Sequence, residues 1–352
     1  MIYEYSERLL QKSVRYGKII KKRRERLMKI GSAELKHGII LAPMAGYTDR
    51  AMRLIAHEYG AEYTVTEMVS ATAVLFGDKK TFSLAKILPD EGAVAVQIFG
   101  NDPSVMAEAT RRLSYPEEGV RPVAIDINMG CPVKKIFSNG EGSALMRDPR
   151  LIERITEAVR LSTDLPVTVK MRAGISLETI NAVECARAAE AGGATLVCLH
   201  GRTREQMYGG RADRRVIAEV KRAIKIPLVA NGDVTDSESA LALLSETGAD
   251  GIAVGRGAVG NPFIFREIIE AIEGKEPTKV TAKERVSTAI KQLEYAVEDK
   301  GERVAIPEAR KQIALYFKGF SGAASARAKI NAATEFAEVR RILSSLIEEE
   351  DV

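Results

Sequence analysis

One cysteine of this sequence stands where a thiol could take part in acid–base chemistry. Cys131 lies in the motif Asn128–Pro132 (NMGCP), directly after an apolar β-type run. The segment 128–148 that contains it is long and bears several glycines, which is typical of lids and binding loops. A free thiol has a reference pKa of about 8.5, so at neutral pH it is mostly protonated and can act as an acid. Cys185 and Cys198 fall within a predicted helix and a predicted strand, where packing explains them.

A lysine and a histidine stand at the ends of two other apolar runs. Lys170 fits a cation that stabilises negative charge on a ligand, because an unpaired ammonium is costly to bury. The competing interpretation is a salt bridge to Glu67 or Asp126. His200 could hydrogen-bond a carbonyl oxygen of a ring, and a structural histidine is the alternative.

Glycines and an arginine gather after the last two apolar runs. Loops at this place in a parallel barrel often bind phosphate, since glycine lets backbone N–H groups approach an anion. Arg256 would add positive charge. The alternative is that the glycines only permit tight turns. This predicted phosphate site consists of Asn231, Gly232, Asp233, Gly255 and Arg256.

A repeating framework must position these residues. Between residues 38 and 272, apolar β-branched runs alternate with segments of helical periodicity, which indicates a parallel sheet covered by helices. Eight such units predict an α/β fold, a closed (β/α)8 TIM barrel; an open doubly wound sheet is the alternative, disfavoured by the count and by the lack of an early GxGxxG motif. The predicted strands are Ile39–Met44, Glu62–Glu67, Ala93–Phe99, Val123–Asn128, Val167–Lys170, Thr195–His200, Leu228–Asn231 and Gly251–Gly255. The predicted helices include Arg50–Tyr59, Pro103–Leu113, Leu151–Leu161, Leu177–Ala191, Asp213–Ile224, Ser237–Thr247 and Pro262–Ile272.

Polar residues concentrate at the carboxyl ends of the predicted strands, where barrels of this kind hold their catalytic groups. A structural protein would have no reason for this distribution. Besides the residues already named, these ends carry Pro43, Met44, Ala45, Gln97, Asn128 and Arg172.

Charge and periodicity divide the chain into three predicted parts. Residues 1–36 form a basic N-terminal extension: the first thirty residues hold ten Lys/Arg against three Glu, which suits either a polyanion contact or a solvated tail. Residues 37–274 form the barrel. Residues 275–352 form a helical domain, mildly basic over residues 276–345 with thirteen Lys/Arg against nine Asp/Glu.

The composition excludes several classes of protein. No apolar stretch approaches the roughly 20 residues of a membrane span, and the charged start lacks the apolar core of a signal peptide, so we expect a cytoplasmic protein. Three widely spaced cysteines do not form a disulfide framework, and no Cys/His cluster predicts a metal site.

Taken in order, the strand-end motifs resemble the tRNA-dihydrouridine synthase family, most closely its bacterial B-type branch. The likeness runs from about residue 38 to 270 and more weakly through the C-terminus. The matching stretches are Leu41–Asp49 (LAPMAGYTD), Val96–Gly100 (VQIFG), Asp126–Pro132 (DINMGCP), Val169–Arg172 (VKMR), Leu199–Thr203 (LHGRT), Ala230–Asp233 (ANGD) and Val254–Gly257 (VGRG).

The resemblance implies an FMN-binding barrel followed by a helical RNA-binding domain. It implies that NADPH or NADH reduces the flavin, which then reduces a uridine of tRNA to 5,6-dihydrouridine: hydride goes from flavin N5 to C6, and Cys131 gives a proton to C5. The flavin ring would lie against Pro43, Met44, Ala45, Gln97, Lys170 and His200, and the ribityl-phosphate against Asn231, Gly232, Asp233, Gly255 and Arg256. Asn128 and Arg172 would orient the uracil, and the RNA backbone would contact the helical domain and Lys134, Lys135, Arg202, Arg204 and Arg211.

Two other functions stay open on sequence alone. One is a different FMN barrel oxidoreductase that acts on a small molecule, such as a dihydroorotate or dihydropyrimidine dehydrogenase, for which the helical domain would be unnecessary. The other is an RNA-binding protein without essential catalysis, for which a purified protein without flavin colour would be expected.

Overall fold

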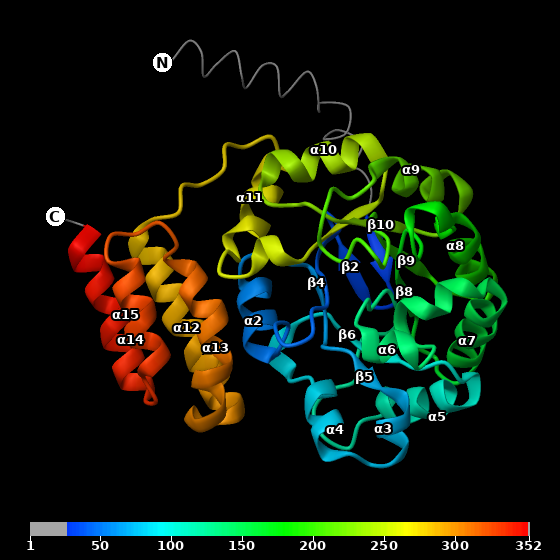
Figure 1. Cartoon of the computed structure of the whole chain (residues 1–352), viewed down its shortest axis with the longest axis horizontal. Coiled ribbons are helices and arrows are strands. Elements are labelled where there is room, and N and C mark those ends of the chain that lie inside the picture. Colours follow the sequence, from blue (N-terminus) through cyan, green and yellow to red (C-terminus); the bar gives the residue numbers. More distant parts are fainter. Residues whose placement is uncertain (1–26, 351–352) are drawn as a thin grey trace, which may run out of the picture.

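The computed structural model describes residues 27–350 and contains a barrel with a group of C-terminal helices beside it (Figure 1). Residues 1–26, most of the predicted basic extension, lie outside the described residues. The strands of the barrel are β3 (Ile39–Leu41), β4 (Tyr63–Val65), β6 (Val94–Phe99), β7 (Ala124–Met129), β8 (Val167–Arg172), β9 (Leu196–His200), β10 (Leu228–Asn231) and β11 (Gly251–Val254).

These eight strands of the described chain form a closed parallel ring. Hydrogen bonds join them in the order β4-β3-β11-β10-β9-β8-β7-β6, and pairing of β4 with β6 closes the ring. A two-residue strand, β5 (Val69–Ser70), adds a short parallel pair to β6. The predicted (β/α)8 TIM barrel is therefore confirmed, and the open sheet is excluded.

Helices cover the outside of the ring (Figure 1). Aspartate side chains accept backbone N–H groups at the start of five of them, which fixes where each helix begins. The covering helices are α2 (Arg50–Glu58), α5 (Pro103–Ser114), α7 (Pro149–Leu161), α8 (Ala182–Ala191), α9 (Arg214–Ala223), α10 (Ser237–Thr247) and α11 (Phe263–Ile272), with α3 (Ala71–Leu75), α4 (Lys79–Ala85) and the 3-10 turn η1 (Pro89–Glu91) between β5 and β6.

One predicted helix is wrong. The segment 177–191 is not continuous: a 3-10 turn, η3 (Leu177–Thr179), precedes α8. Ile180 instead forms an antiparallel bridge with Gly174, and the Asn181 amide donates to the Ala173 carbonyl. The loop after β8 therefore folds back on itself before α8 starts.

The strands are buried on both faces, which explains their continuous apolar sequences. Side chains such as Ile39, Leu41 and Ile98 face the helices in the main core. Side chains such as Ile40 and Val229 fill the inside of the barrel in a second cluster.

A hairpin packs against the end of the barrel where the strands begin. Strands β1 (Met28–Ile30) and β2 (Ala33–Leu35) pair antiparallel, and their buried side chains join the interior cluster of the barrel. Residues 28–35, which we assigned to the N-terminal extension, therefore pack as part of the barrel. The sequence signal is short, a buried–exposed–buried alternation over three residues in each strand.

The segment after β7 is compact. It contains α6 (Lys134–Ser138) and the 3-10 turn η2 (Gly142–Arg147), whose residues Gly142–Met146 are buried. We predicted a mobile loop here, and the structure shows short helices packed against the base of the segment.

Four helices of the described C-terminal part form their own core: α12 (Ala282–Lys300), α13 (Glu302–Tyr316), α14 (Ala323–Ala332) and α15 (Phe336–Glu350). Gly301, at a positive φ of 72°, ends α12 and lets α13 start at once. Phe263 of α11 belongs to this core, and Tyr59, beside α2, donates to or accepts from Thr288 of α12 at 2.8 Å. The helical part is therefore packed against α2 and α11 of the barrel.

Candidate active site

The carboxyl ends of the barrel strands bring most of the predicted site residues to one mouth. In the strand register, Asn128 lies beside Lys170, Arg172 beside His200, and His200 beside Asn231. Residues separated by more than a hundred positions therefore line one continuous arc.

A chain of buried hydrogen bonds crosses the β6–β8 side of this arc. The Thr168 hydroxyl and the Gln97 amide both donate to the Asp126 carboxylate. The side-chain amide of Asn128 donates to the side-chain oxygen of Gln97 at 2.8 Å. The side-chain oxygen of Asn128 accepts the backbone N–H of Cys131 at 2.9 Å. The chain fixes the backbone at the predicted proton donor.

The Cys131 thiol is buried, with 9% of the residue exposed. Ser143 donates both its backbone N–H and its hydroxyl to the Cys131 carbonyl, at 3.1 and 2.8 Å. Burial raises the pKa of the thiol above its ordinary value, although Arg172 and Lys170 act in the opposite direction. Cys131 is therefore a neutral thiol at neutral pH, held in one place.

Lys170 is partly buried at the end of β8, and desolvation lowers its pKa. Neither predicted salt bridge forms: the Glu67 carboxylate accepts the Gly46 N–H at 2.6 Å, and both Asp126 oxygens accept from Thr168 and Gln97. Within residues 27–350 no carboxylate forms a close ion pair with the Lys170 ammonium, although Asp126 attracts it from a greater distance. A largely buried cation without a close partner is the kind of group that an anionic ligand would satisfy.

His200 is buried and uncharged. Burial, with further lowering by nearby cations, depresses its pKa to about 2. The ring lies 3.4 Å from an Arg202 nitrogen and faces Gly232, where a Cβ would come within 3.2 Å of it. A neutral imidazole in this position can hydrogen-bond a ligand without adding charge.

The residues of the predicted phosphate site have different surroundings: some are tightly packed or bonded to the protein, and others are open. Gly232, at φ 130°, has no room for a Cβ, which would meet Ala212 at 2.6 Å, whereas a Cβ at Gly255 would meet nothing closer than 3.6 Å. Asn231 donates its side-chain amide to the Ala253 carbonyl. Asp233 accepts the Ala212 N–H and pairs with Arg202, so its carboxylate holds a loop.

Two buried arginines hold the loop 203–210 that covers one side of the mouth. Arg172 donates to the carbonyls of Thr203 and Met207, both at 2.9 Å, and to the Gly130 carbonyl. Arg202 donates to the carbonyls of Gly209 and Gly210 and is 2% exposed. The prediction that Arg202 contacts an RNA backbone is therefore wrong, because its guanidinium is buried and bonded to the protein.

An exposed aromatic residue in this loop was missed by the sequence reasoning. Tyr208 is 54% exposed, and the guanidinium groups of Arg256 and Arg172 lie 4.8 and 5.9 Å from its ring. The sequence motif after His200 indicated that this loop belongs to the site. Only the conformation of the loop shows that Tyr208 faces Arg172 and Arg256. Arg204, another predicted rim cation, lies over Phe137 of α6.

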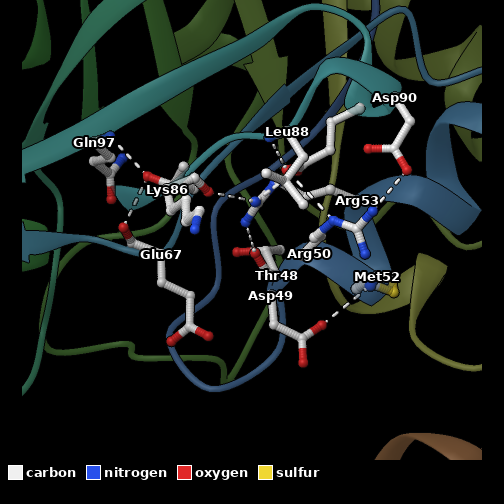
Figure 2. A network of polar contacts seen from close by, with 12 residues as sticks. Thr48, Asp49, Arg50, Met52, Arg53, Glu67, Lys86, Leu88, Asp90 and Gln97 are labelled. Atoms are coloured by element: carbon white, nitrogen blue, oxygen red, sulfur yellow. Dashed lines mark hydrogen bonds and ion pairs between the residues drawn. The ribbon is translucent and has the colours of Figure 1, made fainter. Parts of the chain in front are cut away.

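The β3–α2 loop carries the predicted flavin-lining residues Pro43, Met44 and Ala45. Ala45 is exposed at the rim, and the Thr48 hydroxyl accepts the Met44 N–H at 3.1 Å. Arg53 of α2 holds the loop from behind by donating to the Thr48 carbonyl, as Figure 2 shows. Its guanidinium also pairs with the fully buried Glu91 at 2.6 Å, so the loop is fixed to the barrel wall.

Comparison with known proteins decides the family. The family model "Dihydrouridine synthase (Dus)" matches residues 40–350. The chain belongs to the dihydrouridine synthase family. It is an oxidoreductase, as predicted.

Individual relatives agree with the predicted branch. The chain is 40% identical over 307 residues to the probable tRNA-dihydrouridine synthase of Rickettsia conorii, covering 87% of this chain and 92% of that one. It is 40% identical over 290 residues to tRNA-dihydrouridine synthase B of Shewanella oneidensis, covering 82% and 89%. The resemblance to the B-type branch is thereby confirmed.

A solved structure supports the fold alone. The old yellow enzyme homologue from Zymomonas mobilis matches with a TM-score of 0.50 at 16% identity, over 74% of this chain and 95% of that chain. Within residues 27–350, no helix is long and apolar enough to cross a membrane. The same residues contain no group of three or more His, Cys, Asp or Glu arranged to hold a metal ion.

Proposed function

We propose that this chain reduces uridines of tRNA to 5,6-dihydrouridine in the cytoplasm, using FMN and NADPH or NADH. The observation that carries the proposal is the placement of a buried, protonated thiol, Cys131, on the arc that also holds the unpaired cation Lys170 and the neutral His200. Membership of the dihydrouridine synthase family supplies the reaction class.

The mouth fits FMN. Lys170 lacks a close carboxylate partner and would stabilise negative charge on the ring, beside Met44, Gln97 and His200. A flavin held there and reduced by the nicotinamide would supply the hydride for C6 of the uracil. The remaining predicted ring contacts are Pro43 and Ala45.

The phosphate of FMN fits the β10–β11 side. Gly255 is partly exposed with open space beside its backbone, and the exposed Arg256 supplies charge, whereas Gly232 is buried against Ala212 and His200. Asn231 and Asp233 act by holding their neighbours Ala253, Ala212 and Arg202 in place. We therefore assign the anion contact to the backbone and Arg256.

Cys131 transfers its proton to C5 of the uracil, and the thiolate left behind takes a proton from solvent. Arg172 and Lys170 both lower the pKa of this thiol, so they stabilise the thiolate that forms. Asn128 uses both parts of its amide on Gln97 and Cys131, and we propose that it orients the uracil through the position of Cys131.

The target base must leave its stack to reach this depth. The exposed cations Lys134, Lys135 and Arg211 would bind RNA phosphates, together with the mildly basic helical domain. The proposal is tested by mass spectrometry of tRNA from a strain that lacks this protein. Loss of dihydrouridine at one or more positions, restored by the wild-type chain, is expected; an unchanged dihydrouridine content would overturn it. The purified protein should also show flavin absorbance.

A further inference from the structure

One lysine of the helical domain reaches the loop that lines the mouth of the barrel. The Lys311 ammonium of α13 lies 4.5 Å from the centre of the Tyr47 ring, and a Cβ on Gly46 would come within 3.1 Å of it. Tyr47 and Gly46 directly follow Ala45 in the β3–α2 loop. A cation from a separate part of the fold therefore lies at the rim of the candidate active site.

The loop segment 46–48, against which this lysine lies, is hydrogen-bonded to both the barrel and the helical domain. On the barrel side, Glu67 accepts the Gly46 N–H. Arg53 donates to the Thr48 carbonyl, as Figure 2 shows. On the helical side, Gln312 donates to the Tyr47 carbonyl at 3.2 Å. The Tyr47 ring is thus held still beneath the ammonium.

Helix α13 is also docked on the opposite loop of the mouth. Gly260, which follows η4 (Arg256–Ala258), packs so closely that a Cβ there would lie 2.4 Å from Leu315. Lys311 is one helical turn before Leu315 on the same face. Its side chain is consequently placed between the two loops that we assign to FMN.

Lys311 differs in its partners from two lysines of α12 that tie the helical part to α2 and its N-cap. Lys300 pairs with Asp49 and Glu308, and Lys291 pairs with Glu58. Among the described residues, Lys311 is exposed and forms no ion pair; its ammonium makes a cation–π contact with the Tyr47 ring. Docking of the helical domain already has its own ion pairs, so Lys311 remains available for a ligand.

We propose that Lys311, seated on Tyr47, binds the RNA phosphate next to the nucleotide that enters the mouth. A nucleotide that leaves its stack stays joined to its neighbours through phosphodiesters, which must pass the rim. An ammonium held on an aromatic ring presents its remaining N–H groups outward to such a phosphate. This inference rests on the proposed function, because it takes RNA as the ligand.

The test compares Lys311→Met with Lys225→Met, which removes the same charge from an exposed side chain in the turn before β10, at the opposite end of the barrel. Unmodified tRNA is the probe, and both its binding and its reduction are measured between low and moderate salt. Lys311→Met should weaken tRNA binding by roughly tenfold, the order of one charged hydrogen bond. It should also lower the slope of log affinity against log salt by roughly 0.7 to 0.9. Bound flavin and the rate of flavin reduction by NADPH should not change.

A second pair of variants separates binding from domain docking. Tyr47→Phe keeps the ring and should behave as wild type, whereas Tyr47→Leu should weaken tRNA binding by a few-fold. If Lys311→Met binds tRNA as Lys225→Met does, or loses affinity with an unchanged salt slope, the proposal is overturned. If the wild type binds tRNA through Lys311 but forms no dihydrouridine, the proposed function fails and this inference stands; if the wild type does not bind tRNA, both fail.

Discussion

The two sides of the barrel mouth are built on different principles. On the β6–β8 side, polar side chains bond to one another: Asp126, Gln97 and Asn128 form a closed, buried chain that ends at the backbone of Cys131. On the β10–β11 side, the polar side chains hold loops, while Gly255 has open space beside it and Arg256 is exposed. One side fixes a reactive atom, and the other leaves backbone and charge free for a ligand.

Among changes that leave Cys131 itself in place, the largest effect is expected from breaking the β6–β8 chain. Asn128→Ala removes the acceptor of the Cys131 N–H and leaves the Gln97 oxygen without its donor. A displaced proton donor lowers kcat by about 10²-fold, the scale of a 1 Å error in position. Single-turnover reduction of tRNA checks this, with flavin content as the control. A variant with wild-type kcat would show that the chain does not position Cys131.

Two glycines on the β10–β11 side should behave in opposite ways. A Cβ at Gly257 would lie 2.2 Å from the Val234 carbonyl oxygen, so Gly257→Ala should destabilise the fold by about 2 kcal/mol or more. Gly255→Ala meets no atom closer than 3.6 Å and should fold normally, but its methyl group should weaken FMN binding. Thermal unfolding and flavin titration check the pair. Equal unfolding temperatures for the two variants would contradict this interpretation of the loop.

Lys170 lies where the two sides meet, and its removal should stabilise the flavin-free protein. Its pKa is lowered on folding, so the unfolded state binds more protons between the folded and unfolded pKa values, and stability rises with pH across that window. At neutral pH the buried charge is a cost, and Lys170→Met should raise the unfolding free energy by about 1 kcal/mol while weakening FMN binding. Denaturant unfolding of flavin-free protein measures this. A less stable variant would indicate a structural partner for Lys170.

The smallest effect is expected from pH in the neutral range. Cys131 must be protonated to act, and burial raises its pKa above the ordinary value of a thiol. The rate of the reductive step in tRNA should therefore stay flat from pH 7 through about 8.5, where a free thiol ionises, and fall only at higher pH. Single-turnover rates across this range provide the check. A fall that begins below pH 8 would point to a thiol with an ordinary or lowered pKa.

The sequence predicted the barrel because its strands are buried on both faces, which leaves a strong apolar signal at each strand. It predicted the strand-end residues for the same reason, since the end of the apolar run locates each side chain on the rim. The hairpin β1–β2 was missed because three-residue strands carry little periodicity.

The roles of the arginines could not be read from sequence. Arg172 and Arg202 lie at strand ends like the other site residues. The guanidinium groups of both nevertheless donate hydrogen bonds to backbone carbonyls of the loop 203–210. That outcome depends on a loop conformation in which Met207 adopts a positive φ of 50°. No local pattern in the sequence specifies it, and the exposure of Tyr208 follows from the same conformation.

The central claim is that Cys131 is the acid that protonates the uracil. The direct measurement is a single turnover in which reduced enzyme is mixed with unmodified tRNA, and flavin reoxidation and dihydrouridine are followed together. Cys131→Ala should keep its flavin and bind tRNA, yet react roughly 10² to 10⁴ times more slowly than the wild type. Reaction of Cys131→Ala at the wild-type rate would contradict the assignment.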